Sequence, residues 1–216
     1  AKIPWLRPAP LIIGHRLMVW QNTPYSLPLA ASAVGAFLLA VFILRRRHTP
    51  GAVPFSLVLV AVAEWNASYA LQMASVTFAA KLVFSNLLYI GVVCVPGLWL
   101  LFALEYTGRI ERPSARTCLL LAIEPLLIIA LTWTDSHGIF RTVALDESGA
   151  LSVLAVKYGP LFWVHATYSY LLLLMGALLL GQVLFRTSLL YRHQSRTVLV
   201  GVLAPWIGNA LYISGL

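Results

Sequence analysis

Charged residues are scarce in this sequence, and their scarcity excludes a soluble globular fold. Only 10% of the 216 residues are Asp, Glu, Lys or Arg, whereas 60% are hydrophobic. An ordinary soluble domain contains roughly 25% charged residues. Acidic residues are especially few, with 7 against 15 basic ones. The chain is therefore predicted to lie in a membrane.

Motifs that carry catalysis are also missing. The chain has no HExxH zinc motif, no GxSxG nucleophile motif and no glycine-rich phosphate loop. No predicted span contains a lysine that could carry a retinal Schiff base. The two cysteines, Cys94 and Cys118, lie within or beside apolar segments, so we expect free thiols. We expect no catalytic residues, no metal site and no enzymatic activity.

Long apolar runs dominate what is present. A membrane-spanning helix needs about 20 apolar residues to cross a hydrocarbon core of roughly 30 Å. The runs are continuously apolar and do not alternate, which favours helices over β-barrel strands. The sequence predicts an all-α, polytopic transmembrane bundle over residues 25–216 with about six spans, at residues 25–44, 52–73, 84–106, 117–133, 161–185 and 197–216.

The basic residues indicate how the bundle is oriented. Nine arginines follow the first, third and fifth spans, and the positive-inside rule places them in the cytoplasm: Arg45, Arg46, Arg47, Arg109, Arg112, Arg116, Arg186, Arg192 and Arg196. The opposite connections carry only Lys81, Arg141 and Lys157. The net charge of +8 therefore reflects topology and not nucleic-acid binding. We predict a multi-pass protein of the inner (cytoplasmic) membrane with its N-terminus outside.

Two segments outside the spans are also assigned. Residues 1–24 are interrupted by Pro8, Pro10 and Arg16, so we interpret them as an interfacial segment anchored by Trp5 and Trp20. The longest connection, residues 134–160, falls on the outer face and is expected to cover the outer mouth of the bundle.

Polar residues inside the spans are the candidate functional groups, because ionisable side chains in hydrocarbon cost several kcal/mol unless they are paired or hydrated. Glu64, Ser68 and Gln72 recur every four residues, so they share one helical face that we expect to point into the bundle. Because an ionised carboxylate near the midplane is costly, Glu64 is predicted to be largely protonated.

Four predicted helices place an amide or imidazole at one depth in the outer half. Two interpretations remain open: an outward-facing pocket for a small ligand, or hydrogen bonding between helices that needs the same residue types. The candidate ligand-binding residues are Glu64, Gln72, Asn86, Trp163, His165, Tyr168 and Asn209.

Two further glutamates lie in the predicted spans. Glu124 precedes Pro125 in mid-span, and we interpret it as a protonated group bonded to a neighbouring helix. Glu105 is expected to form an i,i+4 pair with Arg109. His15, His137 and His165 are the side chains that could ligate a haem or chlorophyll metal, although isolated histidines are more often structural.

Four strings together resemble one family, the seven-helix N-terminal sensor region of bacterial and archaeal histidine kinases. They are NLLYIGVVCVPGLWLLFALEYTGR (86–109), EPLLIIALTWTDSHGIF (124–140), YGPLFWVHATYSYLLLLMG (158–176) and APWIGNALYISGL (204–216). Their order and spacing resemble the family from about Leu27 to Leu216, and residues 1–24 fall outside the resemblance.

The resemblance implies a sensor, or input module, of a signal-transduction protein, which passes a stimulus to a cytoplasmic output domain and often works as a homodimer. About six of the family's helices are covered, and its seventh helix and kinase parts would follow Leu216. The alternative is a structural or cofactor-holding accessory subunit of a larger membrane complex, and only there would haem or (bacterio)chlorophyll be expected. The lipid bilayer is the expected partner in either case.

Overall fold

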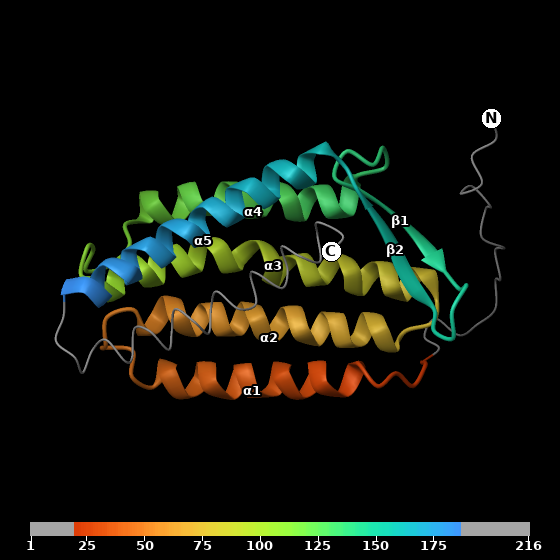
Figure 1. The fold of residues 1–216 in the computed structure, drawn as a ribbon, viewed down its shortest axis with the longest axis horizontal. Coiled ribbons are helices and arrows are strands. Elements are labelled where there is room, and N and C mark those ends of the chain that lie inside the picture. The colour runs from red at the N-terminus through yellow and green to blue at the C-terminus, as the bar shows by residue number, and fades with distance from the viewer. Residues whose placement is uncertain (1–19, 187–216) are drawn as a thin grey trace.

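The computed structural model describes residues 20–186, and these residues form five long helices and one β-hairpin (Figure 1). All five helices are long and apolar enough to cross a membrane. The elements are α1 (Ser26–Leu44), α2 (Ala52–Ala74), α3 (Phe78–Tyr106), α4 (Ala115–Thr134), β1 (Arg141–Asp146), β2 (Val153–Tyr158) and α5 (Pro160–Arg186). The all-α transmembrane bundle predicted from the sequence is confirmed. The predicted span 197–216 and residues 1–19 lie outside the described residues.

Helix α3 starts earlier than the sequence predicted, and this overturns one expectation. The sequence predicts a span that starts at residue 84, but α3 begins at Phe78, with Thr77 as its N-cap, and therefore includes Lys81. The prediction that no span contains a lysine is thus wrong. The side chain of Lys81 is buried, and its Nζ donates to the carbonyl oxygen of Gln72 at 3.0 Å. Carbonyls in the last turn of a helix carry partial negative charge, which stabilises the ammonium there.

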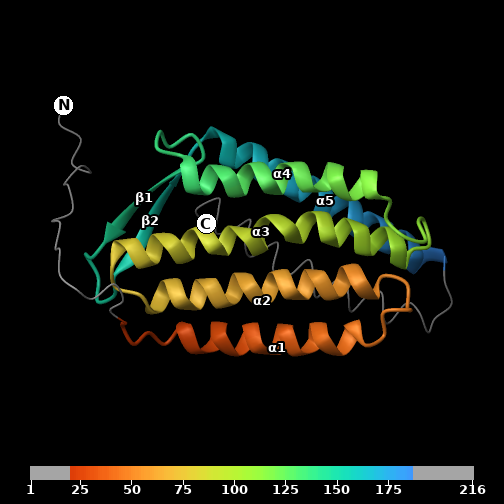
Figure 2. The ribbon, with the colours of Figure 1, turned by 180° about the vertical axis from the view of Figure 1, so that it is seen from behind.

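Helix α3 is the central helix of the described bundle. It packs on α2, α4 and α5, whereas α1 packs on the far side of α2 (Figures 1 and 2). The helix is the most buried of the five, and α1 and α4 are the least buried. Apolar side chains of α1 such as Phe37 and Leu38 point away from the protein. In a bilayer these side chains contact lipid.

Glycines allow α3 to approach its neighbours closely. A side chain on Gly91 would collide with the backbone oxygen of Ala61 in α2 and with the carboxylate of Glu64. On α5, Gly176 lies against the indole of Trp99, whose Nε1 donates to the carbonyl oxygen of Leu173 at 3.1 Å. Small residues at helix contacts are the usual way to bring backbones together in membranes.

The connection 134–160 folds into an antiparallel hairpin that the sequence did not predict. The register pairs Arg141 with Tyr158 and Asp146 with Val153. The strands lie across the ends of α2 and α3 (Figure 1), so this connection does cover one end of the bundle, as expected. This end is called the hairpin end below. The opposite end, with connections 45–51 and 107–114, is called the arginine end.

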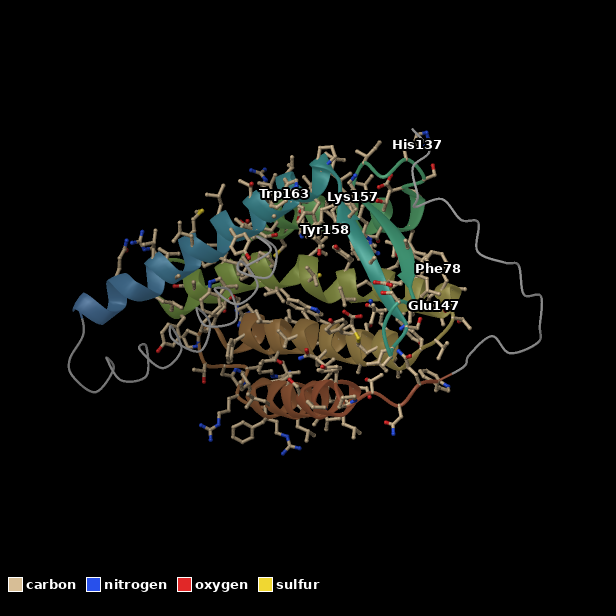
Figure 3. All side chains as sticks on the ribbon, turned by 45° about the vertical axis from the view of Figure 1, so that its right-hand side comes forward. Phe78, His137, Glu147, Lys157, Tyr158 and Trp163 are labelled. Atoms are coloured by element: carbon tan, nitrogen blue, oxygen red, sulfur yellow. The ribbon has the colours of Figure 1, made fainter. Side chains whose placement is uncertain are left out.

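The hairpin is fastened at its tip as well as at its base. Gln21 Nε2 donates to the carbonyl oxygens of Met73 at 2.8 Å and Ser152 at 2.9 Å, and its Oε1 accepts from the backbone N–H of Ser152. Ser152 Oγ donates to the carbonyl oxygen of Val76. In Figure 3 Glu147, at the tip, lies near Phe78 at the start of α3. The hairpin is therefore tied to the α2–α3 connection.

Candidate functional site

The hairpin inserts one arginine into the bundle. Arg141 is 7% exposed. Its guanidinium donates to Ser85 Oγ at 2.8 Å and to Asn86 Oδ1 at 2.6 Å, and it lies 4.5 Å from the centre of the Tyr89 ring. Burial lowers the pKa of Arg141, and the neighbouring Tyr89 and Tyr158 partly oppose this effect. No carboxylate among residues 20–186 pairs with this cation.

Asp135 holds the base of the hairpin in place. Its carboxylate accepts from the backbone N–H groups of His137 and Ile139 at 3.1 Å each, Phe140 at 2.6 Å and Arg141 at 3.2 Å. Partial burial raises the pKa of Asp135, but these four hydrogen bonds outweigh that effect and hold it below its ordinary value. The turn therefore fixes where Phe140 and Arg141 enter the bundle.

Phe140 connects the arginine to a second polar pair. The ring is fully buried, with its centre 5.2 Å from that of Tyr89 and 6.2 Å from that of His165. Arg141 and His165 are therefore connected through the contact between the Tyr89 and Phe140 rings.

Glu124, which is partly buried, and His165, which is buried, form a pair between α4 and α5. Their Oε1 and Nδ1 atoms are 2.5 Å apart, and His165 is 5% exposed. The second carboxylate oxygen of Glu124 and the hydroxyl of Ser169 are both buried and have no hydrogen-bond partner among the described residues. Buried polar atoms are nearly always hydrogen-bonded, so two unpartnered atoms near one pair are unusual.

Glu64 lies between α2 and α3. Its carboxylate accepts from the hydroxyl of Ser68 at 2.7 Å and from the backbone N–H of Gly91 at 2.7 Å. The prediction that this helical face points into the bundle is confirmed, because Glu64 bonds to α3 and Ser68 and Gln72 are buried. That Glu64 is protonated remains a prediction.

With this geometry in place, comparison with known families gives one match. The family of the N-terminal seven-transmembrane region of histidine kinases matches residues 28–216. The chain belongs to this family. No curated protein matches it. The resemblance predicted from the sequence is confirmed, and the chain is a multi-pass membrane module of a sensory type.

The structure brings some of the predicted site residues of this sensor region together. Asn86 and His165 are linked through Arg141, Tyr89 and Phe140. Three of the other predicted residues lie elsewhere: Gln72 is beside Lys81, Glu64 lies against α3, and Trp163, on α5, is 51% exposed (Figure 3). Tyr168 is half-buried on α5. Asn209 lies outside the described residues.

Sequence reasoning missed the partners of these residues in the sensor region. The sequence predicts only a structural role for Glu124, although its carboxylate contacts His165. Arg141 was counted only for topology, because nothing in a loop sequence shows that a side chain turns back into the bundle. The sequence does not indicate that Ser169 belongs to the site, since serine is tolerated almost anywhere in a membrane helix.

One pairing predicted from helical spacing is wrong. Glu105 does not pair with Arg109. Instead its Oε2 accepts from the backbone N–H of Gly51 at 3.1 Å, and Arg109 donates to Gln182 Oε1 at 2.7 Å. The carboxylate is turned toward α2 and the guanidinium toward α5, so both side chains stabilise tertiary contacts.

Among residues 20–186, no three His, Cys, Asp or Glu side chains lie close enough to hold a metal ion.

Proposed function

We propose that this sensor region binds a small polar ligand beside the Glu124–His165 pair, between the hairpin and the middle of the bundle. The observation that carries the proposal is the pair of unpartnered buried atoms, Glu124 Oε2 and Ser169 Oγ. A carboxylate oxygen accepts hydrogen bonds, and a hydroxyl both donates and accepts. A ligand with an amino group and a hydroxyl group would satisfy both atoms.

The site also has a route by which a ligand could alter the bundle. Glu124 and His165 join α4 to α5, and a ligand that bonds to the carboxylate competes with that contact. At the arginine end, α5 is joined to the α3–α4 connection by Arg109 and Gln182. A ligand that binds two arrangements of α5 with different affinity shifts their populations, and α5 carries that shift to the arginine end.

The proposal is tested by screening small amines, amino alcohols and polyols against the chain in lipid nanodiscs. A ligand that binds only the folded state at 100 times its Kd adds about 2.7 kcal/mol of stability. Glu124→Gln replaces one carboxylate oxygen with an amide nitrogen at nearly constant shape, so the affinity of an active compound should fall about tenfold or more. Glu147→Gln, which changes an exposed carboxylate at the hairpin tip, is the matched control.

His165→Phe tests the imidazole nitrogens, because it keeps an aromatic ring at this position and removes the nitrogens. This variant should fold but lose the ligand response. A library with no stabilising compound, or stabilisation that is equal in wild type, Glu124→Gln and His165→Phe, would contradict the proposal.

The cofactor-holding subunit is the competing proposal, and one feature favours it. Glu124 occupies Nδ1 of His165, which leaves Nε2 as the nitrogen able to ligate a haem or chlorophyll metal, in the carboxylate–histidine arrangement common at metal sites. An absorbance spectrum of the purified protein separates the two proposals. Pigment or haem bands that disappear in His165→Phe would favour the subunit, and a colourless protein favours the sensor.

A further inference from the structure

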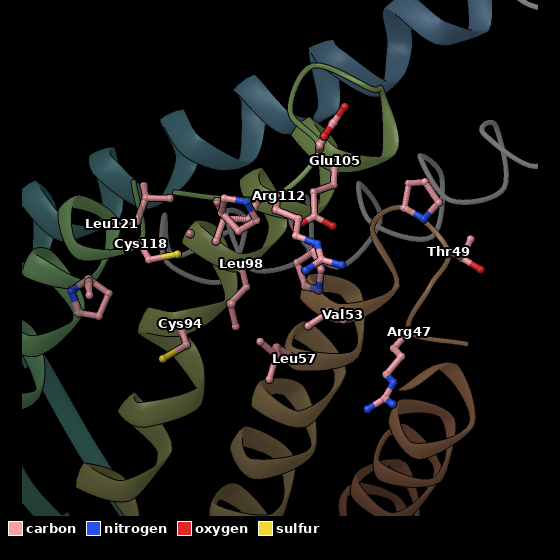
Figure 4. A pocket seen from close by; sticks show the side chains of 18 of the residues that line it. Arg47, Thr49, Val53, Leu57, Cys94, Leu98, Glu105, Arg112, Cys118 and Leu121 are labelled. Atoms are coloured by element: carbon pink, nitrogen blue, oxygen red, sulfur yellow. The ribbon is translucent and has the colours of Figure 1, made fainter. Parts of the chain in front are cut away.

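A cleft of about 930 Å³ lies in the half of the bundle toward the arginine end, between α2, α3 and α4 (Figure 4). Its walls are mainly apolar and include Val53, Leu57, Leu98, Leu101, Leu121 and Leu126. The cleft is distinct from the Glu124–His165 site and has the size of a ligand pocket.

The length of the cleft matches one leaflet of a bilayer. On α3 its lining runs from Cys94, near the middle of the helix, to Glu105 at the arginine end. At 1.5 Å of rise per residue this distance is about 16 Å, which is close to half of a hydrocarbon core of roughly 30 Å. A molecule that fills the cleft therefore extends from a headgroup level to the bilayer centre.

The cleft opens sideways to the membrane. Leu126 lines it and is 63% exposed, and Leu57 on the opposite wall is also exposed. Because these exposed leucines would face lipid, an occupant can enter from the bilayer without crossing water. Both cysteines of the sequence also line the cleft, and neither forms a disulfide.

The end of the cleft at the arginine loops carries both signs of charge. Arg47, Arg112, Glu105 and Glu111 all line it. No salt bridge joins any of these four side chains to another described residue, although Glu105 accepts from the Gly51 N–H. In Figure 4 Arg112 lies at the same end as Glu105, and Cys94 lies at the other end. Two cations and two carboxylates complement a headgroup that contains both charges.

We propose that this cleft binds a phospholipid with a phosphate and a primary ammonium in its headgroup, of the phosphatidylethanolamine type. An acyl chain lies along the leucines, the phosphate meets Arg112 and Arg47, and the ammonium meets Glu111. Arginine matches phosphate geometry, and a primary ammonium has three N–H donors for carboxylates.

The first experiment uses the chain in nanodiscs that contain phosphatidylethanolamine with a photoreactive acyl chain. Cross-links should concentrate on the cleft faces of α3 and α4. Gly97→Leu fills the cleft, since a Cβ there meets Leu121 only at an ordinary 3.7 Å. Gly35→Leu is the matched control because a Cβ at Gly35 meets nothing within 4 Å. Cross-linking should fall at least fivefold in the first variant and stay unchanged in the second.

The second experiment tests the headgroup by competition with unlabelled lipids. Phosphatidylethanolamine should compete better than phosphatidylcholine or phosphatidylglycerol. A basic residue near the headgroups contributes a factor of about five, so Arg112→Gln should weaken competition about fivefold, whereas Arg45→Gln, outside the cleft, should not. Glu111→Gln should remove the preference over phosphatidylglycerol.

Three results would overturn the proposal. One is equal cross-linking along all helices, which indicates only annular lipid. Another is cross-linking that survives both Gly97→Leu and Ala122→Leu, a second cleft-filling variant, since Ala122 lines the cleft from α4. The third is a disulfide scan in which Cys118 couples to cysteines placed in residues 187–216, because that segment and not a lipid would then fill the cleft.

Discussion

The two halves of the described bundle differ in how they accommodate polar side chains. Toward the hairpin end, polar side chains are buried and bonded across elements, as Arg141 is to Ser85 and Asn86. Toward the arginine end, α3 packs through an apolar cluster with Trp99, Phe102 and Leu180 at its centre, and the cleft opens beside it. The first half is therefore held together by buried polar contacts, whereas the second is held by apolar packing beside an open cleft.

The largest expected effect comes from the helix contact that both halves share. Gly91→Ala places a methyl group against the backbone of Ala61 and the carboxylate of Glu64, so α2 and α3 must separate. Overpacking of this kind costs about 3 kcal/mol. We expect that loss in the free energy of unfolding, measured by titration of mixed micelles with sodium dodecyl sulfate.

Gly35→Ala is the matched control for that measurement. A Cβ at Gly35 has no neighbour within 4 Å, so this variant should change the free energy of unfolding by less than about 0.5 kcal/mol. Equal losses in the two variants would mean that the close approach at Gly91 is not required.

A smaller effect is expected when the polar half loses its cation. Arg141→Met removes the hydrogen bonds to Ser85 and Asn86 and leaves both buried groups without this partner. Loss of hydrogen bonds to a charged group costs about 2 kcal/mol. The free energy of unfolding should fall by that amount, and the hairpin amides should exchange with solvent faster.

Lys157→Met gives the control for Arg141, because Lys157 lies exposed on the neighbouring strand (Figure 3). That variant should leave both stability and hydrogen exchange nearly unchanged. If Arg141→Met also changed neither, the buried arginine would contribute nothing to holding the hairpin.

How much was predictable differs between the two halves for a physical reason. Hydrophobic length predicted the five described helices, and most of their ends agree to within two residues, since a span must cover the hydrocarbon. The α3 boundary was missed because Lys81 interrupts the apolar run, yet its ammonium is bonded to the end of α2. Helical periodicity also placed the face of Glu64, Ser68 and Gln72 correctly.

What could not be predicted depends on contacts between segments distant in sequence. The Glu124–His165 pair joins residues 41 positions apart, and the Arg141–Ser85 bond joins residues 56 positions apart. No periodicity within one helix encodes such pairs. The hairpin could not be predicted from the charges of its connection, because it depends on pairing between two short strands, residues 141–146 and 153–158.

The hairpin is also expected to respond to acid through Asp135. Four backbone N–H groups hold the pKa of this carboxyl below its ordinary value. Its stabilising effect is therefore complete above the unfolded-state pKa of about 3.9 and is lost as the pH falls through the lower folded-state value. Hydrogen exchange of residues 137–141 should speed up over that acidic range.

Asp135→Asn tests the assignment of this acid response. An amide presents only one acceptor oxygen, so the turn should be weaker at neutral pH and should lose its acid dependence. If the variant kept the wild-type pH profile, another group would be responsible for it.

The orientation of the two halves relative to the membrane is the last prediction, and it should leave stability unchanged. With Cys94 and Cys118 replaced by alanine, single cysteines at the exposed Ser136 and Ser148 should react with an impermeant maleimide applied to intact cells. A cysteine at Thr49, exposed at the arginine end, should react only after permeabilisation, as should one at Ser195, which lies outside the described residues. The reason is the charge asymmetry, because arginine-rich connections are retained in the cytoplasm. The reverse pattern would place the hairpin inside the cell, where the polar half could not receive an external ligand, although the lipid cleft would be unaffected.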